Sequence, residues 1–193
     1  CKAEALDVIV RWQRAFRVKE GVYNALAYVE NPNLDSGARE VPYRFKLYDA
    51  DNVLIYERKG TTFIPPKKVF GIFESTINTG TRVPARTLFE FLTVPVWEKT
   101  FAVTPSLSIG DKVFSAEGIP RVTASLVNKS EKTVYNVEVV VVLYDSADNA
   151  IATSRTVVDR IERGESTPLV FTWSDELTLS PSRIELIYRP LDF

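Results

Sequence analysis

The sequence predicts an all-β protein built from two tandem copies of one domain, and two observations lead to that prediction. The first is an internal repeat that divides the 193 residues into two halves of similar length. The second is an alternation of apolar and polar residues inside each half, which is the pattern of a half-buried β-strand. Turn-forming Asp, Asn, Gly and Pro residues separate the alternating runs, so each half is expected to contain many short strands.

The repeat consists of three landmarks that occur twice in the same order. An apolar run ends in Asn31 and again in Asn128, 97 positions later. A run led by arginine near the end of each half has the same offset, because Arg86 corresponds to Arg183. Between these two landmarks lies a short motif that repeats after 96 positions; its copies are Phe45-Lys46-Leu47-Tyr48-Asp49 and Val141-Val142-Leu143-Tyr144-Asp145. Copies of about 95 residues have the usual size of single domains, so we predict a first domain over 1–96 and a second over 97–193.

The alternation within each copy predicts strands that bury one face. In the first copy the apolar residues are Val41, Tyr43, Phe45 and Leu47, and in the second they are Val137, Val139, Val141 and Leu143. Further β-branched and aromatic runs follow at Val53–Tyr56, Val69–Phe73, Thr87–Phe91, Val122–Val127, Leu169–Trp173 and Ile184–Tyr188. Many short strands in a unit of this length predict two tandem β-sandwiches of the immunoglobulin or fibronectin kind.

The segment Leu6–Val18 fits two kinds of element. Arginines at positions 11, 14 and 17 have a spacing that suits a helix, whereas Val8-Ile9-Val10 suits a strand. We interpret the segment as the first strand followed by a bulge, because the repeat requires a strand there.

Composition excludes several classes of function. The chain has 24 Lys+Arg against 25 Asp+Glu, no His, no Met and one Cys. Without histidine there is no Ser-His-Asp or Cys-His nucleophile pair and no imidazole ligand for zinc. The near-neutral charge lacks the basic footprint of a nucleic-acid-binding protein. We therefore expect no enzyme activity, no cofactor and no nucleic-acid partner.

Cys1 is the residue that suggests a location. A bacterial lipoprotein begins at a cysteine that carries acyl chains, and two or three such chains anchor a protein stably. The alternatives are that Cys1 is the remnant of an upstream Cys-rich or transmembrane segment, or an unpaired thiol without a role. We expect lipidation of Cys1, slightly ahead of the remnant, and either origin predicts an extracytoplasmic, membrane-anchored protein at the cell surface or in the periplasm.

The repeated motif resembles the FxLYD domain family. The residues that match are Phe45, Leu47, Tyr48 and Asp49 in the first copy and Leu143, Tyr144 and Asp145 in the second, where Val141 replaces the phenylalanine. The longer stretch from Gly21 to Asp51 also resembles uncharacterised membrane-anchored proteins of candidate-phyla bacteria. The resemblance implies small immunoglobulin-like sandwiches in extracytoplasmic proteins, and the family has no known catalytic residues to transfer.

Elementary geometry gives the motif a structural role. Leu47 and Leu143 are expected to point towards a core, while Tyr48 and Tyr144 lie on the opposite face of the sheet. The aspartate that follows each tyrosine opens a hairpin turn, where its carboxylate accepts hydrogen bonds from backbone N–H groups two residues on. Asn31 and Asn128 are expected to do the same at a strand end.

Other candidate sites have a structural explanation that we prefer. The loops that begin at Asp49 and Asp145 resemble calcium loops but lack the Gly and Glu of an EF-hand, so turn chemistry explains them. The basic clusters, Arg11, Arg14, Arg17 and Lys19 with Pro65-Pro66-Lys67-Lys68, suit anionic lipid head groups or a solvated charged face, and we favour the second. The scattered carboxylates Glu30, Glu40, Glu57, Glu74 and Glu90 show no pairing of the kind that glycosidases need. Trp12, Trp97 and Trp173 suit sugar stacking or packing, and for Trp97 and Trp173 we favour core or inter-domain packing.

The sequence therefore predicts a non-enzymatic, extracytoplasmic, membrane-tethered protein that presents a binding or assembly surface to a protein partner in the cell envelope. The alternative is a structural accessory subunit of a larger cell-envelope complex. An extensive exposed apolar patch favours the subunit.

Overall fold

The computed structural model describes residues 5–99 and 105–191, and within them it is an all-β structure. Thirteen strands form four sheets, and every strand pair is antiparallel. The described residues include no helix that is long and apolar enough to cross a membrane. The all-β class expected from the alternation is confirmed.

The chain divides into two compact units, Cys1–Ala102 and Val103–Phe193. This division falls six residues after the end of the predicted first domain at residue 96. The reason is a short strand, β7 (Trp97–Lys99), which pairs with the beginning of β3 through Ala38 and Trp97 and so belongs to the first unit. Each unit is described separately below.

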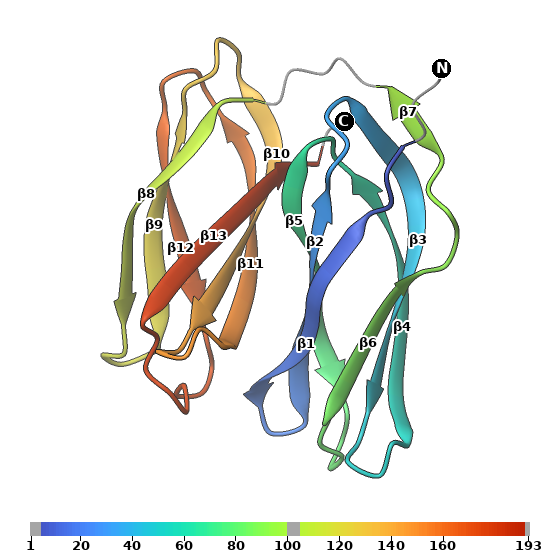
Figure 1. Cartoon of the computed structure of the whole chain (residues 1–193). Helices are drawn as coiled ribbons and strands as arrows, with labels where there is room; N and C mark the ends of the chain where they lie inside the picture. Colours follow the sequence, from blue (N-terminus) through green and yellow to red (C-terminus); the bar gives the residue numbers. More distant parts are fainter. Residues whose placement is uncertain (1–4, 100–104, 192–193) are drawn as a thin grey trace. The chain divides into compact units, whose positions relative to one another are not determined.

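The first unit contains two sheets that face each other (Figure 1). One sheet has the order β1-β2-β5, and the other has the order β4-β3-β6 with β7 also paired to β3. The strands are β1 (Ile9–Lys19), β2 (Val22–Asn31), β3 (Ser36–Tyr48), β4 (Leu54–Ile64), β5 (Lys68–Asn78) and β6 (Arg86–Phe91).

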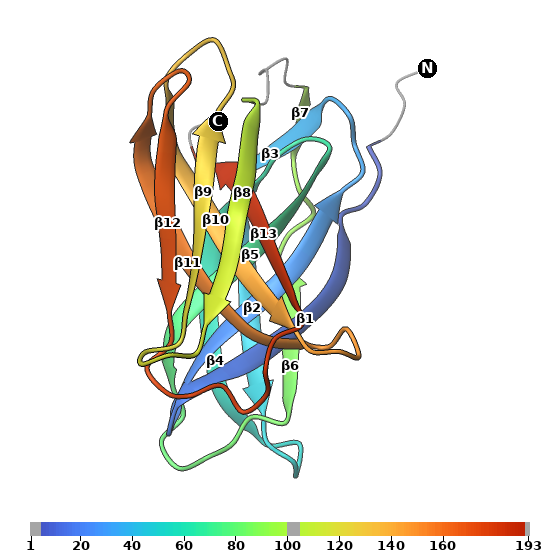
Figure 2. The same cartoon turned by 90° about the vertical axis from the view of Figure 1, so that its left-hand side faces the viewer.

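The second unit has the same arrangement of strands. One sheet has the order β8-β9-β12, whose three strands lie side by side in Figure 2, and the other has the order β11-β10-β13. The strands are β8 (Leu107–Ser115), β9 (Arg121–Asn128), β10 (Val134–Tyr144), β11 (Ala150–Ile161), β12 (Ser166–Thr172) and β13 (Arg183–Pro190). Taken in chain order, β8 to β13 occupy the places of β1 to β6, so the sequence repeat is also a repeat of topology.

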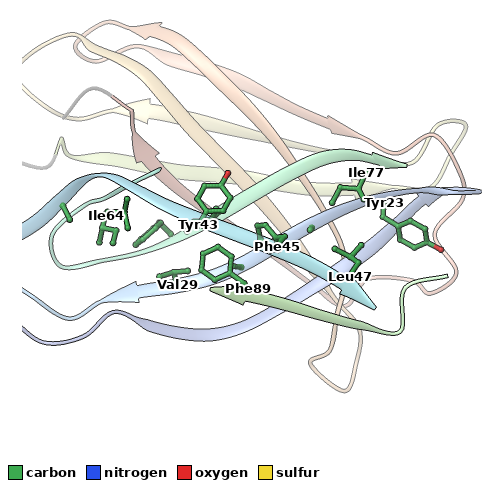
Figure 3. Close-up of a cluster of buried hydrophobic side chains, with 14 residues drawn as sticks. Tyr23, Val29, Tyr43, Phe45, Leu47, Ile64, Ile77 and Phe89 are labelled. Carbon is green, nitrogen blue, oxygen red and sulfur yellow. The ribbon is translucent and has the colours of Figure 1, made fainter. Parts of the chain in front are cut away.

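Each unit buries one apolar cluster to which both of its sheets contribute. In the first unit Phe45 and Phe89 come from one sheet and Val29 from the other, and Figure 3 shows their side chains gathered together. Tyr43, Phe45 and Phe89 are in mutual ring contact, with centroids 4.9 to 6.0 Å apart. Aromatic side chains bury a large apolar area each, so these three rings contribute strongly to the stability of the first unit.

The core of the second unit is built from alternate residues of β10 and their neighbours. Val137, Val139, Val141 and Leu143 are all buried in its cluster, as the period-two pattern requires. The residues between them, Glu138, Val140 and Val142, are buried as well.

A tyrosine and a glycine pack closely across two strands of the first unit. Tyr43 of β3 is paired with Gly60 of β4, and a Cβ atom built at Gly60 would lie 2.4 Å from the Tyr43 hydroxyl oxygen. The absence of a side chain at Gly60 therefore lets the Tyr43 ring cross β4. The Tyr43 hydroxyl donates a hydrogen bond of 2.6 Å to Glu74 of β5, and Arg58 of β4 donates to the same carboxylate at 2.9 Å. These bonds join the open edges of the two sheets.

The segment at the beginning of the chain forms a strand, as predicted. β1 pairs with β2 along its whole length, and the register shifts between Val10 and Trp12 and again between Arg17 and Lys19. Between these shifts the pairing is regular, so Arg14 and Arg17 lie on opposite faces of β1 and their spacing does not indicate a helix.

The sequence patterns did not predict β7, β8 or β11. In β8 the alternation is interrupted, because the register shifts between Gly110 and Val113 and Asp111 has a φ of 53°. β11 contributes Ala152 and Ile161 to the buried cluster, and mostly polar residues lie between them, so no alternating apolar run marks this strand in the sequence. β7 has three residues, too few for a period to show.

Candidate binding pocket

The repeated motif builds the same turn in both units. Asp49 accepts backbone hydrogen bonds from Asp51 at 3.1 Å and Val53 at 2.9 Å. Asp145 accepts from Ala147 and Asn149, each at 2.9 Å. Each carboxylate is therefore used to hold a turn.

The tyrosine before each turn has an arginine over its ring. The guanidinium of Arg86 lies 4.2 Å from the ring centroid of Tyr48, and that of Arg183 lies 3.7 Å from the centroid of Tyr144. Arg183 also donates to Asp148 at 2.6 Å, and this hydrogen bond raises the pKa of Arg183 above its ordinary value. Phe45, Val141, Leu47 and Leu143 are all buried in the two cores. The motif residues in the described structure thus make contacts that support the fold.

The candidate calcium loops do not gather a ligand set. The described residues contain no group of three or more acidic, histidine or cysteine side chains that is able to hold a metal ion. Arg82 also approaches the carboxylate of Asp49, at 3.5 Å. A cation at this turn would have to displace the arginine.

The scattered carboxylates are mostly bound to arginine. Glu30 pairs with Arg11, and Arg44 lies between Glu57 and Glu90. Glu74 holds Arg58, and Glu40 is exposed with a φ of 48°. The described structure does not bring these five residues together as a pair flanking a cleft.

The basic residues at Lys67 and Lys68 have different surroundings. Lys67 is exposed, while Lys68 is half-buried, and burial lowers the pKa of Lys68 to about 8. In the other predicted cluster, Arg11 is bound to Glu30. These differences favour the interpretation of the predicted clusters as parts of charged faces rather than as one site.

The three tryptophans pack against neighbouring side chains. Trp173 is buried in the second core, where its indole N–H donates to the backbone oxygen of Thr153 at 3.3 Å. Trp97 packs against the first core. Trp12 stacks on Tyr28 with ring centroids 5.2 Å apart, so one face of its indole is occupied. Core packing is confirmed for Trp173.

An open pocket of about 700 Å³ lies at one end of the second unit. Three short segments line it: the residues just before β8, the turn between β9 and β10 with the beginning of β10, and the last residue of β13. The lining residues are Pro105, Ser106, Lys129, Ser130, Glu131, Lys132, Thr133, Val134, Tyr135 and Pro190. A volume of this size is in the range of ligand-binding sites, roughly 300 to 1,000 Å³.

Asn128 fixes the shape of this pocket. Its buried amide donates to the backbone oxygens of Lys132 at 2.8 Å and Ile161 at 3.0 Å, and its side-chain oxygen accepts from the backbone N–H of Ser130 at 2.9 Å. The backbone N–H of Lys129 donates to Ser106 at 2.8 Å, which joins the turn to the segment before β8. The turn between β9 and β10 is therefore held in place without a ligand.

The pocket combines apolar walls with unpaired positive charge. Tyr135 is 49% exposed beside two prolines, Pro105 and Pro190. Within the described residues, neither Lys129 nor Lys132 has a carboxylate partner. Glu131 is the acidic residue of the lining, and Arg163 binds it at 2.9 Å.

Sequence reasoning missed this pocket because its residues come from three separate parts of the chain. The signal in the sequence was Lys129-Ser130-Glu131-Lys132, a short charged turn directly after Asn128. Charged turns between strands are common, so this pattern alone does not indicate a site.

Cys1 lies outside the described residues, and its lipidation stays a prediction. Comparison of the chain with protein-family models and with curated proteins found no match. Membership of the FxLYD family therefore also stays a prediction.

Proposed function

We propose that the chain is a non-enzymatic binding protein and that the pocket at Lys129–Tyr135 is its binding site. The observation that carries the proposal is the coexistence of an exposed tyrosine, two prolines and two unpaired lysines around one concavity. Preformed concave sites with apolar walls and a few polar groups are where proteins bind ligands.

The proposal includes the class of the two domains. Each unit has two antiparallel sheets with an apolar cluster between them, and the four sheets have three strands each except the sheet of β3, which also includes β7; this supports immunoglobulin-like β-sandwiches. The resemblance of the repeated motif to FxLYD domains supports the same class and an extracytoplasmic location. Sandwiches of this kind commonly carry binding residues on loops that a rigid scaffold positions.

A titration of the full chain with 1-anilinonaphthalene-8-sulfonate, an apolar anion, tests the proposed site. We expect shifts of backbone amide NMR signals within residues 129–135, and a loss of these shifts in Tyr135→Ser. Ile119→Ser is the matched control, because Ile119 is also an exposed apolar residue of the second unit and lies outside the pocket. Shifts confined to other residues, or equal shifts in both variants, would contradict the proposal.

The second candidate is a structural subunit of a larger envelope complex. It is favoured by an exposed apolar segment between β6 and β7 of the first unit, where Val94 is 82% and Val96 is 76% exposed. Contiguous exposed apolar patches mark protein–protein interaction sites, and this candidate places such a site at these valines. Replacing both valines with serine is expected to release a stable partner during purification from native membranes if this candidate is correct.

A further inference from the structure

We infer that the second-unit pocket binds an acidic peptide segment of a partner protein, with carboxylates on Lys129 and Lys132 and apolar side chains against Tyr135. The inference rests on the proposed function and specifies the chemistry of the ligand. It follows from the charge, the walls and the shape of the pocket.

The positive charge of the two lysines indicates that the ligand carries negative charge. The ammonium groups of Lys129 and Lys132 have no carboxylate partner among the described residues, while the negative charge of Glu131 is balanced by Arg163. A ligand with carboxylates at both lysines completes two ion pairs. Exposed pairs contribute roughly 0.2–1 kcal/mol each, so two of them change the affinity about two- to thirtyfold.

The walls indicate an apolar chain between the charges. The apolar part of the lining consists of Val134, Pro105 and Pro190 together with the half-exposed ring of Tyr135. Rigid aromatic and proline surfaces lose little conformational entropy when a ligand covers them, which favours binding. A small inorganic anion would leave these surfaces uncovered.

Shape favours a peptide over a membrane surface. The pocket is concave and about 700 Å³ in volume, so an extended chain is able to enter it, while a bilayer surface contacts only its rim. The turn that carries both lysines is already held by Asn128, so the ligand does not have to order it.

Fluorescence anisotropy of labelled peptides with the full chain tests the inference. The probe is a ten-residue peptide in which Asp and Glu alternate with Leu and Val, and the matched peptide has Asn and Gln in place of the acids. We expect the acidic peptide to bind about two- to thirtyfold more tightly at low salt. We also expect its affinity to fall as salt is raised, because the ion pairs are exposed.

Charge reversal locates the site. Lys132→Glu is expected to weaken the acidic peptide at least fivefold, and the double variant with Lys129→Glu to weaken it further. Arg121→Glu makes the same charge change at the other end of β9, and Arg121 is exposed and outside the pocket, so it should change binding less than twofold. The denaturation midpoint of each variant verifies that it is folded.

The outcomes separate the inference from the proposed function. If both peptides bind equally and Tyr135→Ser weakens both, the pocket is a binding site but the inference about charge is wrong. If the lysine and Tyr135→Ser variants bind the acidic peptide as the unchanged protein does, both proposals are wrong for this ligand class. Failure of both peptides to bind also overturns the inference. Lysine-dependent binding of phosphatidylglycerol vesicles in place of the peptide would overturn it in favour of a lipid surface.

Discussion

Asn31 and Asn128, 97 positions apart in the chain, use their buried side-chain amides in the same way. Asn31 donates to the backbone oxygens of Ser36 and Pro65, each at 2.8 Å, and accepts from the backbone N–H of Asn33 at 3.0 Å. Asn128 donates to the backbone oxygens of two residues and accepts from the N–H two positions on. Each amide therefore ties the turn after its strand to a second segment of the same unit.

Removal of either amide is expected to destabilise its own unit. Asn31 and Asn128 are 1% and 0% exposed, so alanine leaves backbone oxygens in the interior without a donor. We expect Asn31→Ala and Asn128→Ala each to lower the free energy of unfolding by about 2–4 kcal/mol, measured by chemical denaturation. Substitution of either residue by Asp should lower the free energy of unfolding by a similar amount, because a carboxylate does not donate the hydrogen bonds that the amide N–H groups donate.

Asn78→Ala is the matched control for these substitutions. Asn78 is exposed and accepts one backbone hydrogen bond, from Gly80 at 2.9 Å. We expect a loss below about 1 kcal/mol, since water replaces the lost partner. Equal losses in all three alanine variants would show that the buried amides have no special role.

Gly60→Ala should strain the first unit. The new Cβ would lie 2.4 Å from the hydroxyl oxygen and 2.5 Å from Cζ of Tyr43, so the ring has to move and its bond to Glu74 is lost. Overpacking of this kind costs about 1–3 kcal/mol, which thermal or chemical denaturation measures. Gly110→Ala is the control, because its Cβ would meet Ser125 at an ordinary 3.5 Å. A Gly60→Ala loss no larger than that of the control would contradict the prediction.

Lys68 should make stability depend on alkaline pH. Because burial lowers the pKa of Lys68 to about 8, the unfolded chain binds more protons between that value and the ordinary 10.5. The contribution of Lys68 to the free energy of unfolding therefore rises with pH between about 8 and 10.5. Lys68→Met should remove this rise and raise stability at pH 7 by about 1 kcal/mol or more, as denaturation across pH measures.

Lys67→Met is the control for the alkaline experiment, because Lys67 is the exposed neighbour of Lys68. It should leave the pH dependence unchanged. An identical pH profile for Lys68→Met and the unchanged protein would show that Lys68 does not control it.

Asp145→Ala should loosen the hairpin turn of the second unit. The substitution removes the acceptor for the backbone N–H groups of Ala147 and Asn149, and the turn is exposed, so water compensates in part. We expect a loss of about 1 kcal/mol, measured by denaturation, and a smaller loss for Asp145→Asn, which keeps an acceptor oxygen. Asp159→Ala, at an exposed aspartate of β11, should change stability by less than about 0.5 kcal/mol. Similar effects at Asp145 and Asp159 would argue against the turn bonds.

Strands that bury one face could be predicted from the sequence, and strands with irregular registers could not. Val41 to Leu47 alternate regularly, and the structure places these apolar side chains in one core. β8 escaped prediction because a bulge at Asp111 breaks its period, and a local pattern does not reveal where a partner strand shifts register. The turn aspartates act within four residues of the chain, which is why short motifs identified their bonding. The pocket depends on segments that meet only after folding, so no local pattern indicates it.

β3 and β10 are equivalent strands of the two units, but they differ in the residues that point away from the core, and this difference affects whether the two strands are able to exchange places during folding. The two units share one strand order, and tandem domains of the same topology are prone to exchange equivalent strands while they fold. β3 alternates Arg44 and Lys46 with its core residues, whereas β10 has Val140 and Val142 at the corresponding places. An exchange would place Arg44 and Lys46 where Val140 and Val142 are buried, and it would separate Arg44 from its partner Glu90. The divergence of these two strands is therefore expected to disfavour an exchange of strands between the two units.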